Sequence, residues 1–304
     1  MTGPGPIRIA NAPCSWGVLE FDPPGKALGY AQVLDEIRDA GYEGTELGDW
    51  AFMPTDPSVL RDELTKRGLE MVGAFVPVAF ANERAHEQGA AIAMRTANLL
   101  AGVHGNSPFL VLADDNGQDP NRTKKAGRID AADALNENQW RTFARGVERV
   151  ARAVRDQTGL RCVFHHHCAG FIETPAEITR LLDLTNPELV GLCFDTGHYT
   201  FGGGDALAGL QRHRDRIWHV HFKDCSPALH QRSRVEAWNY FESLKHGIFC
   251  ELGKGQVDFA AILAELRRTG YTGWIVVEQD VLCGMGAPKD FAKRNRAYLQ
   301  KLGV

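Results

Sequence analysis

The sequence predicts a single (β/α)8 barrel that spans residues 1–304, with its active site at the C-terminal ends of the strands. Three observations support this fold. Eight short apolar runs are typical of buried strands, amphipathic segments separate them, and a length of 304 residues suits one large barrel. The phrases at 39–44 and 268–274 are near copies that each join a helix to a strand, which indicates a repeated βα unit.

An open doubly wound sheet is the alternative fold for alternating strands and helices. It would favour a glycine-rich phosphate-binding turn after the first strand, whereas the turn from Pro13 to Val18 has no such pattern. The glycines at 202–204 follow the sixth strand and lack the Lys-Ser/Thr pair of a P-loop, so we expect a flexible loop there. The closed barrel is therefore the favoured interpretation.

The expected strands show no clean alternation of apolar and polar residues, as in strands that are buried on both faces. In chain order they cover residues 7–12, 44–47, 70–76, 109–113, 161–166, 190–194, 217–222 and 274–278. Helical periodicity between them predicts helices over 30–40, 57–67, 140–156, 174–182 and 259–268. Pro175 after Thr174 is the usual N-cap and first-turn arrangement, and glycines close several of these segments.

Two polar insertions interrupt this pattern, at 116–134 after the fourth strand and at 229–254 after the seventh. In a barrel both insertions fall on the C-terminal face, where loops build the active site. We therefore expect them to contribute to a binding site.

Composition and charge exclude several classes of protein. The net charge of −4 gives no reason to expect a nucleic-acid surface, and no apolar run is long enough to cross a bilayer. The first residues, 1–6, lack the basic and apolar regions of a signal peptide. Seven scattered cysteines without a CxxC pair favour reduced thiols and a cytoplasmic location. The common habit of this fold favours a homo-oligomer.

Candidate metal ligands stand at the ends of four consecutive predicted strands. Asp195, His221 and Glu278 end strands six, seven and eight, and a histidine triplet ends strand five. Because side chains alternate along a strand, we prefer His165 of the triplet as the fourth ligand. Such buried polar groups need partners, and a divalent cation would hold them together. Oxygen and imidazole ligands suit Mn²⁺, Co²⁺, Fe²⁺ or Zn²⁺.

Other polar residues near these strand ends are candidates for catalysis. Glu46 ends strand two at a height suited to a general base or a hydroxyl binder. His167 lies further up the same face as His165, and His198 follows Asp195 by three residues. Lys223 lies beyond His221 on the same face, where it can neutralise an enediolate or contact a substrate oxygen, although a solvated lysine is equally consistent with the sequence.

Two further residues are candidates for contacts with a small polyol or keto-sugar. Trp16 could form an apolar wall for a sugar-like ring, although a single aromatic residue more often packs in a core. His219 precedes His221 by two residues and points the same way but deeper, so it could also support the ligands from behind.

The motifs at these positions resemble the xylose-isomerase-like barrel superfamily of sugar isomerases and epimerases, and within it the inosose (2-keto-myo-inositol) dehydratases. The resemblance covers residues 7–302 and rests on four stretches: Gly41 to Gly48, His165 to His167, Asp195 to Asp205, and His219 to Asp224.

The resemblance implies a Mn²⁺- or Co²⁺-dependent lyase with Asp195, His221 and Glu278 as ligands, and glutathione as a cofactor associated with that group. Most epimerase relatives have a glutamate where this chain has His165, which favours elimination over two-base epimerisation. An epimerase or isomerase of keto-sugars or keto-inositols remains the alternative activity.

The resulting hypothesis is a metal-assisted β-elimination of water through an enediolate. Glu46 or a histidine of the triplet would remove the α-proton, and His167 or His198 would act as the acid.

Overall fold

The computed structural model describes residues 6–18, 28–103, 107–282 and 284–304, and its strands form a closed barrel. Most of the N-terminal segment considered for a signal peptide lies outside the described residues. The barrel strands are β1 (Arg8–Asn11), β2 (Gly44–Glu46), β3 (Glu70–Pro77), β4 (Phe109–Ala113), β5 (Cys162–His165), β6 (Val190–Asp195), β7 (Ile217–Phe222) and β10 (Trp274–Val277). Neighbouring strands are parallel, and β1 pairs with β10 to close the barrel. The predicted fold class is therefore confirmed.

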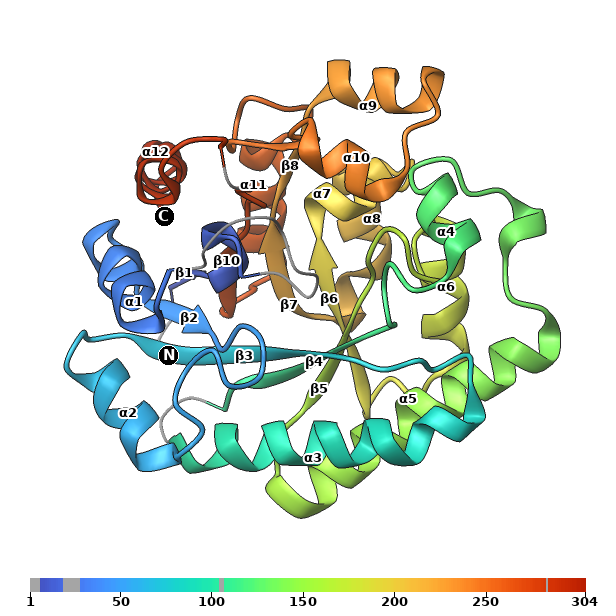
Figure 1. The fold of residues 1–304 in the computed structure, drawn as a ribbon, viewed down its shortest axis with the longest axis horizontal. Coiled ribbons are helices and arrows are strands. Elements are labelled where there is room, and N and C mark those ends of the chain that lie inside the picture. The colour runs from blue at the N-terminus through green and yellow to red at the C-terminus, as the bar shows by residue number, and fades with distance from the viewer. Residues whose placement is uncertain (1–5, 19–27, 104–106, 283) are drawn as a thin grey trace.

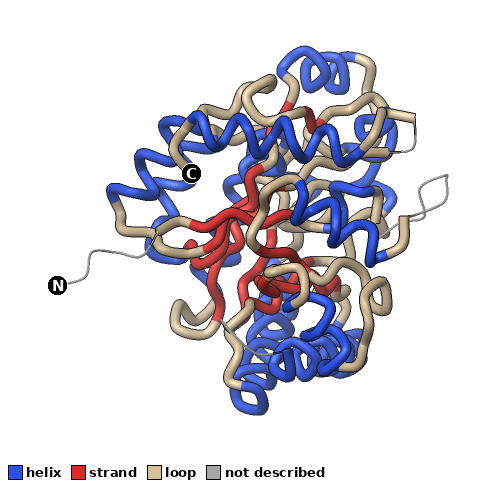
Figure 2. The backbone as a smooth tube through the Cα atoms, turned by 90° about the vertical axis from the view of Figure 1, so that its left-hand side faces the viewer, coloured by secondary structure: helices blue, strands red, loops and turns tan. Residues whose placement is uncertain are grey.

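Helices surround the strands on the outside (Figure 2). The long ones are α1 (Tyr30–Asp39), α2 (Pro57–Thr65), α3 (His86–Val103), α5 (Glu137–Thr158), α6 (Pro175–Leu184), α8 (Ala206–His213), α11 (Phe259–Arg268) and α12 (Pro288–Lys301). The five helices expected from periodicity are present, whereas α3, α8 and α12 did not stand out in the sequence. In α3 the reason is its alanines, which lie on both faces and blur the apolar stripe.

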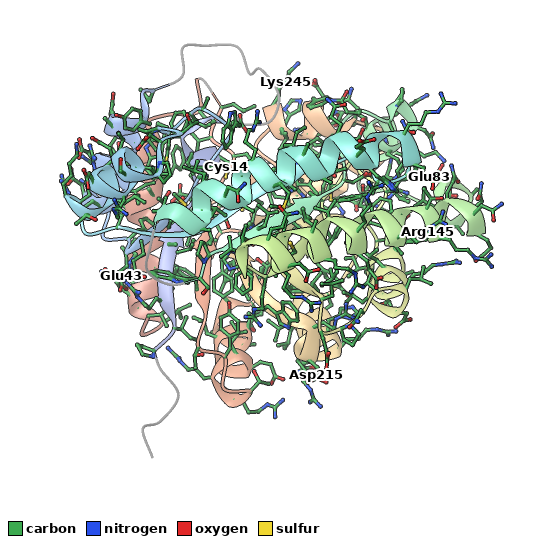
Figure 3. The ribbon with its side chains drawn as sticks, turned by 90° about the horizontal axis from the view of Figure 1, so that it is seen from below. Cys14, Glu43, Glu83, Arg145, Asp215 and Lys245 are labelled. Atoms are coloured by element: carbon green, nitrogen blue, oxygen red, sulfur yellow. The ribbon has the colours of Figure 1, made fainter. Side chains whose placement is uncertain are left out.

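Helix α5 shows how an outer helix is fixed to the barrel. Its apolar stripe, including Trp140 and Phe143, is buried, and an Asn136–Gln139 capping box satisfies its first backbone N–H groups. The helix ends at Gly159, whose φ of 74° suits a glycine. Helices α3 and α5 lie side by side in Figure 3, where Lys245 and Asp215 mark the C-terminal and N-terminal ends of the barrel.

The two insertions fold into short elements at the C-terminal end of the barrel. The first contains α4 (Pro120–Lys125). The second contains α9 (Pro227–Val235) and α10 (Tyr240–Lys245), and a hairpin of β8 (Asp224–Cys225) and β9 (Phe249–Cys250) frames it. The two insertions contact each other, as Figure 1 shows for α4 and α10. They therefore form one continuous cover beside the barrel mouth.

Arginines hold this cover in place. Arg128 Nη1 donates hydrogen bonds to the backbone oxygens of Ser233, at 3.0 Å, and Trp238, at 2.8 Å. Arg122 forms two hydrogen bonds with the Glu177 carboxylate, at 2.8 and 2.9 Å, and both side chains are buried. A paired, planar contact of this kind fixes the first insertion to helix α6.

The glycines at 202–204 form a packed turn after α7 (Thr196–Phe201), in contrast to the expected flexible loop. The Gly202 N–H donates to the His198 carbonyl at 2.8 Å. A Cβ atom on Gly204 would lie 2.2 Å from the Tyr199 ring, and one on Gly202 would lie 2.6 Å from the Glu173 carbonyl oxygen, so neither position has room for a side chain. In the described part of the chain, no helix combines the length and apolar character that a membrane span requires.

We expect Arg122→Met to lower the free energy of unfolding by about 3–5 kcal/mol, because it leaves the Glu177 carboxylate buried without its partner. Denaturant unfolding followed by circular dichroism measures this loss. Arg149→Met on the exposed face of α5 is the matched control and should change stability by less than about 0.5 kcal/mol. Equal stability of the two variants would contradict the anchoring role of Arg122.

Candidate metal and substrate site

Four side chains at the ends of neighbouring strands converge inside the barrel. His165 ends β5, Asp195 ends β6, His221 lies on β7 and Glu278 directly follows β10. Each offers one ligand atom, and these atoms lie within 4.8 Å of one another in buried surroundings. The structure thus brings together all four residues that the sequence predicted as metal ligands.

Two distances in this cluster are too long for direct hydrogen bonds but suit a shared partner. His165 Nε2 lies 3.7 Å from Asp195 Oδ2, and His221 Nδ1 lies 4.0 Å from the same oxygen. His221 Nδ1 also lies 3.1 Å from Glu278 Oε1, although the geometry there is not that of a hydrogen bond. Asp195 Oδ2 and His221 Nδ1 are therefore buried without hydrogen-bond partners. Because such groups are costly to bury alone, this donor set fits a divalent cation.

Two other groups, which share His221, could also approach a metal ion. They are Glu46 with His219, and His165 with Cys193. Glu46 Oε1, however, already accepts hydrogen bonds from His219 Nε2, at 2.9 Å, and His221 Nε2, at 3.0 Å. A metal-binding histidine commonly donates its second N–H to a carboxylate in this way. This leaves His221 Nδ1 directed toward Asp195 and Glu278, which favours the four-residue cluster.

The carboxylates of the site attract positive charge. Burial alone would raise the pKa of Glu46, but the charge of His221 and the hydrogen bonds from both histidines hold it at about 2. Burial lowers the pKa of His221, whereas Cys193, Glu278 and Glu46 raise it, and the net shift is well upward. A proton or a cation is thus strongly favoured at His221.

Lys223 stands beside the cluster and is almost fully buried. Its Nζ lies 3.1 Å from Glu278 Oε2 and 3.2 Å from Asp280 Oδ1. Burial lowers the pKa of Lys223, but Asp280 and Glu278 outweigh burial and raise it well above its usual value. Lys223 passes directly over Gly197, where a Cβ atom would lie 2.6 Å from Lys223 Cγ. A residue with a side chain at position 197 would therefore clash with Lys223, which explains why the Asp-Thr-Gly-His stretch has glycine there.

The rings of His167 and His198 are in close contact, with centroids 3.8 Å apart and planes tilted by 37°. His167 Nδ1 donates to the Cys168 carbonyl at 2.6 Å, which leaves Nε2 as an acceptor that faces the Tyr240 hydroxyl at 3.4 Å. The Cys168 N–H donates to His198 Nδ1 at 3.3 Å, and Lys223 Nζ lies 3.3 Å from His198 Nε2. Burial lowers the pKa of both rings, which keeps both imidazoles neutral.

A cavity of about 60 Å³ opens next to these residues. Five of the residues singled out in the sequence line it: Glu46, His165, His167, Lys223 and Glu278. The remaining ligand candidates and His198 lie directly behind this lining. The cavity therefore exposes ligands, a fixed positive charge and a neutral imidazole to the same small volume.

Trp16 and His219, the two residues expected to contact a substrate, are not among the residues that line this cavity. Trp16 packs in the main core, and its Nε1 donates to Glu36 at 2.7 Å. His219 lies beneath Glu46 and is fully buried. Their contact with a substrate stays a prediction.

Asp280 and Tyr240 also line the cavity, although neither was predicted from the sequence as a site residue. Asp280 could have been predicted, because it lies two residues after Glu278 and therefore on the same side of an extended chain. Tyr240 could not have been predicted, since it reaches the site from an insertion whose conformation no local pattern predicts. Burial raises the pKa of Asp280, and the charge of Lys223 opposes that shift.

Comparison with known proteins places the chain in a family. The pattern of the family described as "Xylose isomerase-like TIM barrel" matches residues 34–302. The chain belongs to this family. It is 32% identical over 302 residues to an inosose dehydratase of Geobacillus kaustophilus (strain HTA426), an alignment that covers 98% of this chain and 95% of that protein.

Solved structures share the same fold at lower identity. One is an IOLI protein with a bound zinc atom, which has a TM-score of 0.70 and 13% identity and covers 97% of this chain and 98% of its own. Another is an L-ribulose 3-epimerase, with a TM-score of 0.71, 18% identity and coverage of 98% and 94%. At this identity the likeness supports the fold alone.

We expect Asp195→Asn to weaken the binding of Mn²⁺ or Zn²⁺ by more than the roughly 10- to 100-fold typical of the loss of a supporting partner. The substitution removes a ligand charge but keeps an oxygen that can cap α7, where Asp195 now accepts the His198 N–H. Titration calorimetry measures the affinity. Asp114→Asn, a buried carboxylate outside the cluster, is the control, and an equal loss in both variants would place the metal elsewhere.

Proposed function

We propose that this member of the xylose isomerase-like barrel family is a divalent-metal-dependent hydro-lyase. Its substrate is 2-keto-myo-inositol or a similar keto-polyol. The observation that carries the proposal is the four-residue ligand cluster, which meets Lys223 and His167 at one cavity. The similarity to inosose dehydratases over nearly the whole chain supports elimination of water as the reaction.

His165, Asp195, His221 and Glu278 would hold the cation, with Mn²⁺ or Co²⁺ as the expected metal and Fe²⁺ or Zn²⁺ as others that this donor set accepts. A cation bound there supplies Lewis-acid polarisation of a substrate carbonyl and its neighbouring hydroxyl. Glu46 contributes by orienting His221 through the hydrogen bond to Nε2.

His167 is the residue best placed to move a proton. It lines the cavity, burial lowers its pKa so that the ring is neutral, and its Nδ1 donates to the Cys168 carbonyl, so the ring lone pair lies on Nε2, which faces the Tyr240 hydroxyl. Glu46 is less available as a base, since two histidines already donate to one of its carboxylate oxygens. We therefore assign removal of the α-proton to His167 Nε2.

Loss of the β-hydroxyl as water completes the proposed elimination. The α-carbon loses its proton to His167, the electron pair of that C–H bond forms a carbon–carbon double bond, and the β-hydroxyl leaves. His167 returns the proton to the departing oxygen, so the lost fragment is water. Lys223, which lines the cavity, neutralises the negative charge that develops on the substrate oxygens. His198 Nε2 lies 3.3 Å from Lys223 Nζ.

We expect the full chain reconstituted with Mn²⁺ or Co²⁺ to convert 2-keto-myo-inositol to a product lighter by one water. Mass spectrometry of the reaction mixture measures this change. Chelation of the metal should abolish turnover, and re-addition should restore it. A product of unchanged mass would instead support the alternative epimerase, and full turnover in a thoroughly chelated protein would contradict metal dependence.

A further inference from the structure

Glu173 is a buried carboxylate that the proposed mechanism does not use. It lies in the loop between β5 and α6, does not line the cavity and is 1% exposed. Each of its oxygens accepts a backbone hydrogen bond. Oε1 accepts from the Gly127 N–H of the first insertion at 2.7 Å, and Oε2 accepts from the Ala169 N–H at 2.9 Å. Glu173 thus joins the first insertion to the loop that follows the histidine triplet.

The Ala169 N–H and the Cys168 carbonyl belong to one planar peptide group. Glu173 binds the N–H side of this peptide, and His167 Nδ1 donates to its carbonyl side at 2.6 Å. A hydrogen bond from the N–H to a carboxylate makes the carbonyl oxygen of the same peptide a stronger acceptor. The carboxylate and the imidazole are therefore linked through a single peptide unit.

The local backbone is consistent with a peptide that is held in place. Ala169 has a φ of 68°, a left-handed conformation that is uncommon for a residue with a side chain. The hydrogen bond from its N–H to Glu173 compensates for this strain. The preceding N–H, that of Cys168, donates to His198 Nδ1. One short stretch of backbone therefore contacts both imidazole rings and holds the Nδ1 proton of His167.

We infer that Glu173 is a positioning residue, which holds His167 in the tautomer with its proton on Nδ1 and its lone pair on Nε2 through the Cys168–Ala169 peptide. A catalytic role for this tautomer rests on the proposed function, in which His167 Nε2 receives a proton. The assignment of the tautomer is independent of that function, since it follows from the hydrogen bond that Nδ1 donates to the Cys168 carbonyl.

The positive charge of Arg122 stabilises the ionised form of Glu173. Burial raises the pKa of Glu173 to about 7, while Arg122 and the N–H groups of Gly127 and Ala169 act in the opposite direction. At alkaline pH the side chain is a carboxylate, and both of its oxygens are acceptors. Glutamine at this position would keep the shape but place an NH₂ group against one of the two backbone N–H groups.

Nitrogen-15 NMR of histidine-labelled full chain at alkaline pH, with and without added Zn²⁺, tests the inference without reference to activity. In the wild type we expect the His167 proton on Nδ1. In Glu173→Gln we expect a mixture of tautomers or a shift to Nε2. Asp114→Asn is the control, because Asp114 accepts the Phe171 N–H of the same loop but does not contact the Cys168–Ala169 peptide. Its His167 signals should match the wild type.

A His167 proton on Nε2 in the wild type would overturn the inference even if Glu173→Gln failed to fold. Unchanged His167 signals in a folded Glu173→Gln variant would also overturn it. Either result would overturn the tautomer inference but not the proposed function. Conversely, a wild type that does not convert 2-keto-myo-inositol would overturn the proposed function but not the tautomer inference.

Kinetics provide a second readout that a purely structural role would not give. We expect Glu173→Gln to lower kcat roughly 10- to 100-fold with little change in KM, as is typical when the partner of a functional histidine is lost. In a His167→Gln background the same substitution should have no further effect, because the residue through which it acts is gone. Additive losses in the double variant would contradict action through His167.

Discussion

Asp195 and Glu278 place two carboxylates inside a barrel, at a depth that water barely reaches, and their charge must be balanced there. His165, His221 and Lys223 are the groups that the fold brings within reach. The balance is incomplete, since an oxygen of Asp195 and a nitrogen of His221 have no hydrogen-bond partner. The rest of the site follows from this constraint. In the proposed function a cation at the cluster would complete the balance, and the same positive charge would help a keto-polyol to lose a proton beside its carbonyl.

The barrel strands and the insertions contribute different residues to the candidate site. Neighbouring parallel strands carry the candidate ligands, as the direct pairing of Asp195 with His221 shows. The second insertion contributes Tyr240 to the cavity wall, where its hydroxyl faces His167, and the first insertion binds Glu173 through the Gly127 N–H. The arginine contacts between the insertions make this cover a fixed part of the structure. The strand ends thus carry most of the candidate site, and the insertions support it from one side.

The fold and the ligand cluster could be predicted because both depend on local signals. A buried strand is recognisable from its own residues, and strand ends of a closed barrel necessarily meet, so Asp195, His221 and Glu278 could be placed without coordinates. Glu173 and Tyr240 could not. Their roles depend on loop conformations that bring distant segments together, and loops show no periodic pattern of apolar residues from which a conformation could be predicted. The helix α3 was missed for a related reason, because its alanines carry little pattern.

The position of the cation tests the central claim most directly. Anomalous diffraction from crystals grown with Mn²⁺ or Zn²⁺ should show one peak bonded by His165, Asp195, His221 and Glu278, at about 2.0–2.2 Å for zinc. A peak held by Glu46 and His219 instead, or no peak at the cluster in crystals that contain the metal, would contradict the account.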